Sequence, residues 1–132
     1  MEFKTDIPQS QRALFLMAKK NLELRTTDVP QPQAGEVLLK IGSVGVCGSD
    51  KHFYFDGRCG SEMITEPMIM GHEFGGAIVA VGKGISPHRV GQRVSVDPLV
   101  PCGRCQHCLQ GNYNICPTQK FFGVPGTYGA MQ

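Results

Sequence analysis

The feature that most constrains this chain is a group of four cysteines within fifteen residues. They are spaced C-x2-C-x2-C-x7-C, at Cys102, Cys105, Cys108 and Cys116. A structural zinc site needs four ligands on one ion, and each thiolate sulfur lies about 2.3 Å from the metal. Short C-x2-C steps with glycines in the turns allow the sulfurs to converge. The spacing therefore predicts a four-thiolate zinc site, which has no open coordination position and stabilises a loop.

Two other uses of closely spaced cysteines fit this sequence less well. A redox-active C-x2-C pair belongs at the start of a helix in a βαβ unit, and the segment here is rich in glycine and proline instead. A disulfide framework suits small secreted chains. At 132 residues the chain can bury a core without crosslinks, and its apolar run near the start, Ala13–Ala18, is too short for a secretory signal. We therefore expect reduced cysteines in a cytoplasmic protein.

Composition and charge narrow the class of protein. The chain is 41% hydrophobic and 18% charged, with 17 glycines and 9 prolines, which favours a domain rich in strands and turns over a helical bundle. Thirteen basic and eleven acidic residues give a formal net charge of +2. That small, scattered charge does not indicate nucleic-acid binding, and no apolar run is long enough to span a membrane.

The order of apolar and turn residues predicts a mainly β domain, either a barrel or a sandwich. We expect a loose segment over residues 1–12 and one domain over residues 13–132. A helical turn is predicted at Ser49–Tyr54 and a loop over Asp56–Glu66. Strands are predicted at Leu14–Met17, Leu22–Thr26, Val37–Ile41 with continuation to Val46, Phe74–Val81, Arg93–Asp97 and Phe121–Val124. Gly75 and Gly76 suggest a bulge or a close backbone approach.

A second group of candidate metal ligands is spread along the chain. Cys47 closes a predicted strand, and His72 and Glu73 open another, so a thiolate, an imidazole and a carboxylate can meet in one cleft. Catalytic zinc needs three protein ligands and an open fourth position. On the residues alone, His72 is equally well interpreted as a core histidine and Glu73 as a surface carboxylate. Cys59 is expected to be a free, half-buried thiol, and His88 and His107 are expected at the surface.

Three motifs in the same order resemble those of one enzyme family. Gly71–Gly76, followed by Gly82 and Ile85, resembles the zinc signature G-H-E-x2-G-x5-G-x2-hydrophobic of the medium-chain zinc-dependent alcohol dehydrogenases. The four cysteines resemble that family's structural-zinc loop, and Cys47–Asp50 with His52 resembles its catalytic-zinc segment. Sorbitol and L-idonate 5-dehydrogenases look most similar. The resemblance starts near Ala13 and implies a GroES-like, partly open β-barrel with short helices and a zinc-stabilised loop lobe.

The resemblance implies a role for each residue of the second group. Cys47 and His72 would bind a catalytic zinc, and Glu73 would bind it or lie beside it. Asp50 would accept a hydrogen bond from the far nitrogen of His72, which fixes the tautomer of a metal-bound histidine. On spacing alone, Asp50 is as well interpreted as a helix cap.

The resemblance also implies a path for a proton. Ser49 would take the proton of an alcohol bound at the metal, and His52 would pass it towards solvent. Without the resemblance, Ser49 is better interpreted as a helix cap and His52 as an exposed side chain. Phe121 and Phe122 would line a substrate pocket, although aromatic residues on a strand also commonly belong to a core.

The sequence departs from the family pattern in the cofactor-binding part. Hydride transfer to NAD or NADP needs a dinucleotide-binding domain, whose first helix follows a G-x-G-x-x-G motif. This sequence contains no such motif before a helix. Gly82 and Gly84 match its first two glycines, but Pro87 stands at the position of the third. Phe53 stands where sorbitol dehydrogenases often carry tyrosine. We therefore expect the N-terminal catalytic domain of an alcohol or polyol dehydrogenase, inactive alone, whose full-length form is a homo-oligomer. There are two alternatives. The chain could be a stand-alone zinc-binding or dimerisation module, or it could be a decaying remnant of such an enzyme.

Overall fold

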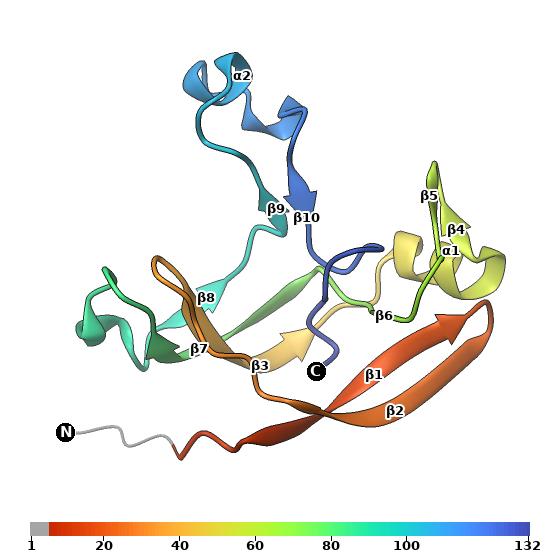
Figure 1. Ribbon diagram of the computed structural model, residues 1–132, viewed down its shortest axis with the longest axis horizontal. Helices are drawn as coiled ribbons and strands as arrows, with labels where there is room; N and C mark the ends of the chain where they lie inside the picture. The colour runs from red at the N-terminus through yellow and green to blue at the C-terminus, as the bar shows by residue number, and fades with distance from the viewer. Residues whose placement is uncertain (1–5) are drawn as a thin grey trace.

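The computed structural model describes residues 6–132, and its first element is a long antiparallel hairpin (Figure 1). β1 (Ser10–Ala18) pairs with β2 (Asn21–Asp28) from Ser10 opposite Asp28 onwards. Lys20 at the two-residue turn has a positive φ of 59°. The hairpin predicted from the sequence is confirmed, and both strands are longer than predicted.

The prediction of a loose segment over residues 1–12 is wrong for residues 10–12, which belong to a strand. Ser10, Gln11 and Arg12 pair with β2 as part of β1. The polar side chains of these residues gave no sequence signal for a strand. The hydrogen bonds of a strand pair join backbone groups, whatever side chains the residues carry. Residues 1–5 lie outside the described part of the chain.

The second sheet has the order β3-β7-β8 and is antiparallel throughout. It consists of β3 (Val37–Val44), β7 (Phe74–Val81) and β8 (Arg93–Ser95). The register shifts between Ile41 and Ser43, opposite Gly76 and Gly75, so the predicted irregularity exists but its extra residue lies on β3. A Cβ at Gly76 would overlap the carbonyl oxygen of Lys40, which is the close backbone approach that the glycines predicted.

The remaining elements are short, and several differ from the sequence prediction. The helical turn is a full helix, and the predicted loop after it contains a small hairpin. Of the predicted strand at Phe121–Val124, only Phe121 is in a strand, because a turn follows at once. These elements are α1 (Gly48–Asp56), β4 (Arg58–Cys59), β5 (Glu62–Met63), β6 (Met68–Ile69), η1 (Pro87–Arg89), β9 (Leu99–Val100), α2 (Gln106–Leu109), η2 (Tyr113–Ile115) and β10 (Lys120–Phe121).

The core lies where α1 packs against the first sheet, whose order is β2-β1-β6. Leu16, Phe53, Met68 and Met70 form one buried cluster, and Cys59 packs against it as a half-buried free thiol. The segment 129–131 runs beside residues 69–71 through three backbone hydrogen bonds. The sheets do not close on each other, which confirms the predicted mainly β, partly open barrel. Within residues 6–132, no helix is long and apolar enough to cross a membrane.

Candidate metal centres

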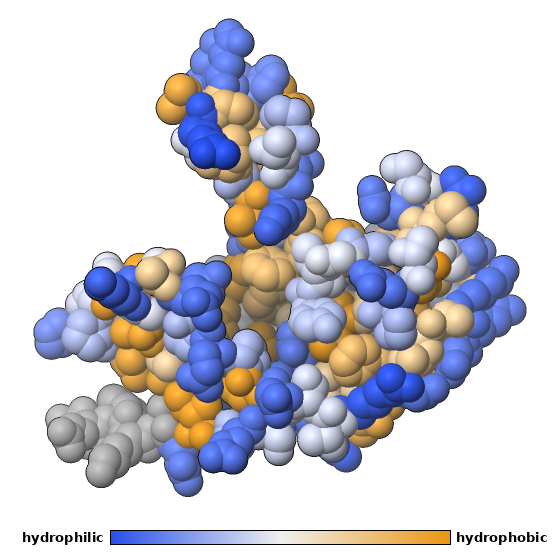
Figure 2. All heavy atoms as spheres, in the orientation of Figure 1, coloured by the Kyte–Doolittle hydropathy of each residue, from blue (hydrophilic) through white to orange (hydrophobic). Residues whose placement is uncertain are grey.

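The four-cysteine lobe, residues 101–119, stands out from the rest of the molecule (Figure 1). β9 and β10 form its base, where Val100 pairs with Lys120 and Leu99 with Phe121. Hydrophilic residues dominate its tip in the space-filling view (Figure 2). The lobe therefore joins the sheets through a narrow two-residue ladder and must hold its own shape beyond it.

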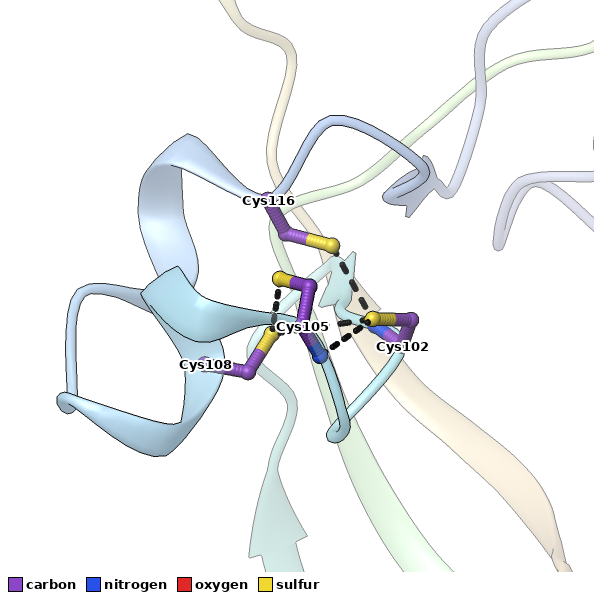
Figure 3. Close-up of side chains that lie close together, drawn as sticks. All are labelled: Cys102, Cys105, Cys108 and Cys116. Atoms are coloured by element: carbon purple, nitrogen blue, oxygen red, sulfur yellow. Dashed lines mark hydrogen bonds between the residues drawn. The ribbon is translucent and has the colours of Figure 1, made fainter.

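The four sulfurs of the lobe converge on one point (Figure 3). The Sγ atoms of Cys105 and Cys108 are 3.4 Å apart, those of Cys102 and Cys108 are 3.9 Å apart, and all four lie within 4.8 Å of one another. A disulfide has an S–S distance of about 2.05 Å, and all four cysteines are free. A tetrahedral site with 2.3 Å bonds separates its sulfurs by about 3.8 Å. The four residues thus fit zinc and not a disulfide.

Backbone amides prepare two of these thiols for metal binding. Hydrogen bonds from the N–H groups of Arg104 and Cys105 lower the pKa of Cys102 to about 6, and the N–H of Cys102 lowers the pKa of Cys116. Burial, together with the neighbouring thiol of Cys105, raises the pKa of Cys108 to about 12. Because thiolates are the metal ligands, binding must release the proton of Cys108.

The structure also brings Cys47, His72 and Glu73 together. Cys47 follows β3 as the N-cap of α1, while His72 and Glu73 directly precede β7. One ligand atom from each residue lies within 4.8 Å of the other two. His72 is 8% exposed, and Glu73 is exposed. The pairing of β3 with β7 produces this meeting, because it aligns the end of one strand with the start of the other.

Asp50 combines the two roles that the sequence left open. Its Oδ2 accepts a hydrogen bond of 2.9 Å from the backbone N–H of Cys47, so it caps α1 from the first turn. Its Oδ1 lies 3.8 Å from Nδ1 of His72, and among residues 6–132 neither of these two buried atoms has a hydrogen-bond partner. The predicted hydrogen bond to His72 is therefore too long in this structure, although the two groups face each other.

The surroundings of His72 fit a metal ligand. Nδ1 faces the carboxylate of Asp50, and Nε2 lies 3.4 Å from Oγ of Ser49. A histidine that binds a metal commonly offers one ring nitrogen to the ion and the other to a carboxylate. Thiolate, imidazole and carboxylate are the donor types of catalytic zinc sites. The three residues and Asp50 therefore fit a zinc ion by chemistry and by arrangement.

A cavity of about 760 Å³ opens beside these residues. The ring of Phe121 lies 5.3 Å from that of His72, centre to centre, and lines the cavity. Phe122 was expected in the same pocket but instead packs edge-on against Phe74 and lines a different cavity. Phe121 ends β10 and Phe122 begins the turn that follows, so the two rings point into different cavities. The lining residues are Ser43, His72, Glu73, Phe74, Gly75, Ser95, Val96, Pro98 and Phe121.

The other sequence candidates fall outside the two groups. His52 is exposed on α1, and its Nδ1 pairs with Oδ2 of Asp56 at 3.0 Å. His88 is exposed as expected, whereas His107 is half buried because it lies on α2 within the lobe. The pairing of Asp56 with His52 was not predicted from the sequence. The signal was available, because side chains four residues apart on a helix lie next to each other.

Replacing Asp50 by alanine is expected to lower the free energy of unfolding by about 1–3 kcal/mol, because it leaves the N–H of Cys47 without its acceptor. Asp56→Ala on the same helix is the control, since an exposed ion pair contributes about 0–1 kcal/mol. Urea denaturation of both variants at saturating zinc measures the difference. Equal losses would contradict the capping role of Asp50.

Comparison with known proteins identifies the family. The sequence model of the family described as the alcohol dehydrogenase GroES-like domain matches residues 33–132 of this chain. The chain belongs to this family. The predicted resemblance to the medium-chain zinc-dependent alcohol dehydrogenases is thereby confirmed.

Individual relatives of this GroES-like domain are dehydrogenases. Sorbitol dehydrogenase from Bacillus subtilis is 42% identical over 125 residues, which are 95% of this chain and 35% of that protein. A crystal structure of short chain alcohol dehydrogenase from Escherichia coli CFT073 with NADH has a TM-score of 0.83 at 37% identity, covering 94% of this chain and 35% of that one. L-Idonate 5-dehydrogenase from E. coli K-12 has a TM-score of 0.78 at 32% identity, covering 92% and 36%. The chain thus spans about a third of the length of these relatives.

Proposed function

We propose that this GroES-like domain is the metal-binding catalytic part of a zinc-dependent dehydrogenase. The enzyme would oxidise a secondary alcohol or polyol by hydride transfer to NAD or NADP. The observation that carries the proposal is the meeting of Cys47, His72 and Glu73 within 4.8 Å of one another, with His72 and Glu73 in the wall of a cavity. Relatives named sorbitol and L-idonate dehydrogenase support a substrate with several hydroxyl groups.

Some residues of the site would bind the metal, and one would orient a metal ligand. Cys47 and His72 would hold the catalytic zinc, with Glu73 as a ligand or close neighbour. When bound, zinc supplies a Lewis acid that makes an alcohol hydroxyl easier to deprotonate. Asp50, buried behind His72, would keep the imidazole oriented with Nε2 available to the metal.

Ser49 and His52 would carry the proton away from the substrate. Oγ of Ser49 lies beside Nε2 of His72, so it borders the metal position and can accept the hydroxyl proton. His52 lies three residues further along α1, on the same side of the helix, and is exposed. The path from Ser49 to His52 therefore leads from a half-buried position to solvent.

The four-cysteine lobe would hold a second, structural zinc ion. Its four thiolates leave no coordination position for substrate. Free thiols at metal spacing favour a reducing compartment. We further propose that the 132-residue chain does not turn over alcohols by itself, because its sequence has no glycine-rich turn that would open a dinucleotide-binding helix. The full-length form would be a homo-oligomer.

Metal analysis of the purified chain tests this function. The wild-type chain is expected to bind two zinc ions, and Cys47→Ser is expected to bind one, because the lobe retains its four thiolates. Cys59→Ser is the matched control, since Cys59 belongs to neither group, and it should keep both ions. A single zinc in the wild-type chain would favour a stand-alone structural module. Turnover of polyols with NAD above the level of Cys47→Ser would refute the inactivity of the isolated chain.

A further inference from the structure

Gly45 lies opposite Glu73 at the place where β3 and β7 separate. The last ladder pair is Val44 with Phe74, and beyond it the N–H of Gly45 donates a hydrogen bond of 2.7 Å to the carbonyl oxygen of Glu73. Directly opposed residues of an antiparallel pair carry their side chains on the same face. A side chain at position 45 would therefore point towards that of Glu73.

The carboxylate of Glu73 occupies the space that such a side chain would need. A Cβ built on Gly45 lies 2.7 Å from Oε2 and 3.2 Å from Cβ of Glu73. The first distance is below the separation of about 3.3 Å at which carbon and oxygen usually touch. Gly45 does not have a positive φ, so its backbone conformation does not require glycine. The constraint at this position is the room left for one carboxylate.

We propose that Gly45 is a positioning residue for Glu73, which it allows to remain within reach of Cys47 and His72. The inference rests on the proposed metal centre, and it adds a residue that binds nothing itself. Any side chain at position 45 would displace Oε2, since the carboxylate is the flexible end of an exposed side chain. The displacement would cost little stability and would shift the carboxylate that offers an oxygen donor to the metal centre.

Cobalt binding separates this role from a structural one. The probe is Co²⁺ alone, titrated against a competing chelator, with the Cys47 site identified as the one lost in Cys47→Ser. Gly45→Ala is expected to raise the Kd for Co²⁺ at this site about 10- to 100-fold, the usual effect of losing a supporting group. Binding at the four-cysteine lobe should not change, and the thermal midpoint should stay near that of the control.

Gly42→Ala is the matched control, because it places the same methyl group three residues earlier, on β3. A Cβ at Gly42 meets only backbone atoms at ordinary distances of 3.6 and 3.8 Å. This variant should bind Co²⁺ at both sites as the wild type does. Glu73→Ala should weaken the Cys47 site as much as Gly45→Ala does, and the double variant should lose no more than either single one, because the two changes act through the same carboxylate.

Several outcomes would overturn the proposal. They are a wild-type Kd for Gly45→Ala, a wild-type Kd for Glu73→Ala, or an equally large further loss when Gly45→Ala is added to Glu73→Ala. A Gly45→Ala chain that does not fold also overturns it, because the proposal requires the side chain of Glu73 to absorb the added methyl group. Wild-type chain that binds Co²⁺ only at the four-cysteine lobe would instead refute the proposed function itself, together with this inference.

Discussion

Removing zinc from the four-cysteine lobe is expected to unfold residues 101–119 while both three-stranded sheets stay folded. Throughout residues 101–119, all of which the structure describes, only Cys116 is buried. Leu109 is 75% exposed, and Ile115 and Tyr113 are also exposed. The lobe has no apolar core to hold it, so its order must come from metal bonds. Structural zinc contributes about 10–16 kcal/mol of apparent binding free energy in small domains.

Hydrogen exchange followed by mass spectrometry measures this effect. Amides of residues 101–119 should lose protection when a chelator is added and regain it with zinc, while β1 and β7 remain protected. Cys105→Ser should show the same loss even with zinc present, and Cys59→Ser should behave like the wild type. A lobe that remains protected after its zinc has been removed would contradict the metal-dependent fold.

Phe53→Ala is expected to lower the free energy of unfolding by about 3–5 kcal/mol. Phe53 is 2% exposed and belongs to the buried cluster with Leu16 and Met68. Its removal leaves a cavity between α1 and the first sheet, which the surrounding strands cannot fill. Urea denaturation at saturating zinc measures the loss.

Phe55→Ala is the control, because it removes the same side chain two residues away on the same helix. Phe55 is 48% exposed and makes an edge-on contact with Tyr54, a kind of contact that contributes about 0.5–1.5 kcal/mol. The difference between the two variants therefore isolates burial. Similar losses for Phe53→Ala and Phe55→Ala would show that α1 is not anchored through Phe53.

The same core contact bears on the metal centre. α1 carries Ser49 and Asp50 on its first turn, with Cys47 as its N-cap. Phe53 fixes this helix against β1 and β6. Phe53→Ala should therefore weaken metal binding at the Cys47 site more than at the four-cysteine lobe, which is attached through β9 and β10 instead.

Local patterns in the sequence predicted the hairpin, the β3 and β7 strands and the start of α1. Each depends on residues close together, such as the turn at Lys20 or the apolar run of Phe74–Val81. The predictions failed where polar residues extend a strand through backbone pairing alone, as at Ser10, or where neighbouring side chains diverge, as at Phe122. In such places the side chains near in sequence do not reveal the partner.

The sequence by itself determined the four-cysteine site, because its ligands lie within fifteen residues and short turns can bring the sulfurs together. Only the tertiary structure decided how Cys47 meets His72 and Glu73, and that Gly45 leaves room for the carboxylate. These residues approach one another through the β3–β7 ladder, whose register is shifted by irregular pairing. A shift of one residue moves every following side chain to the other face, so the meeting follows from the folded sheet and not from the spacing of the residues.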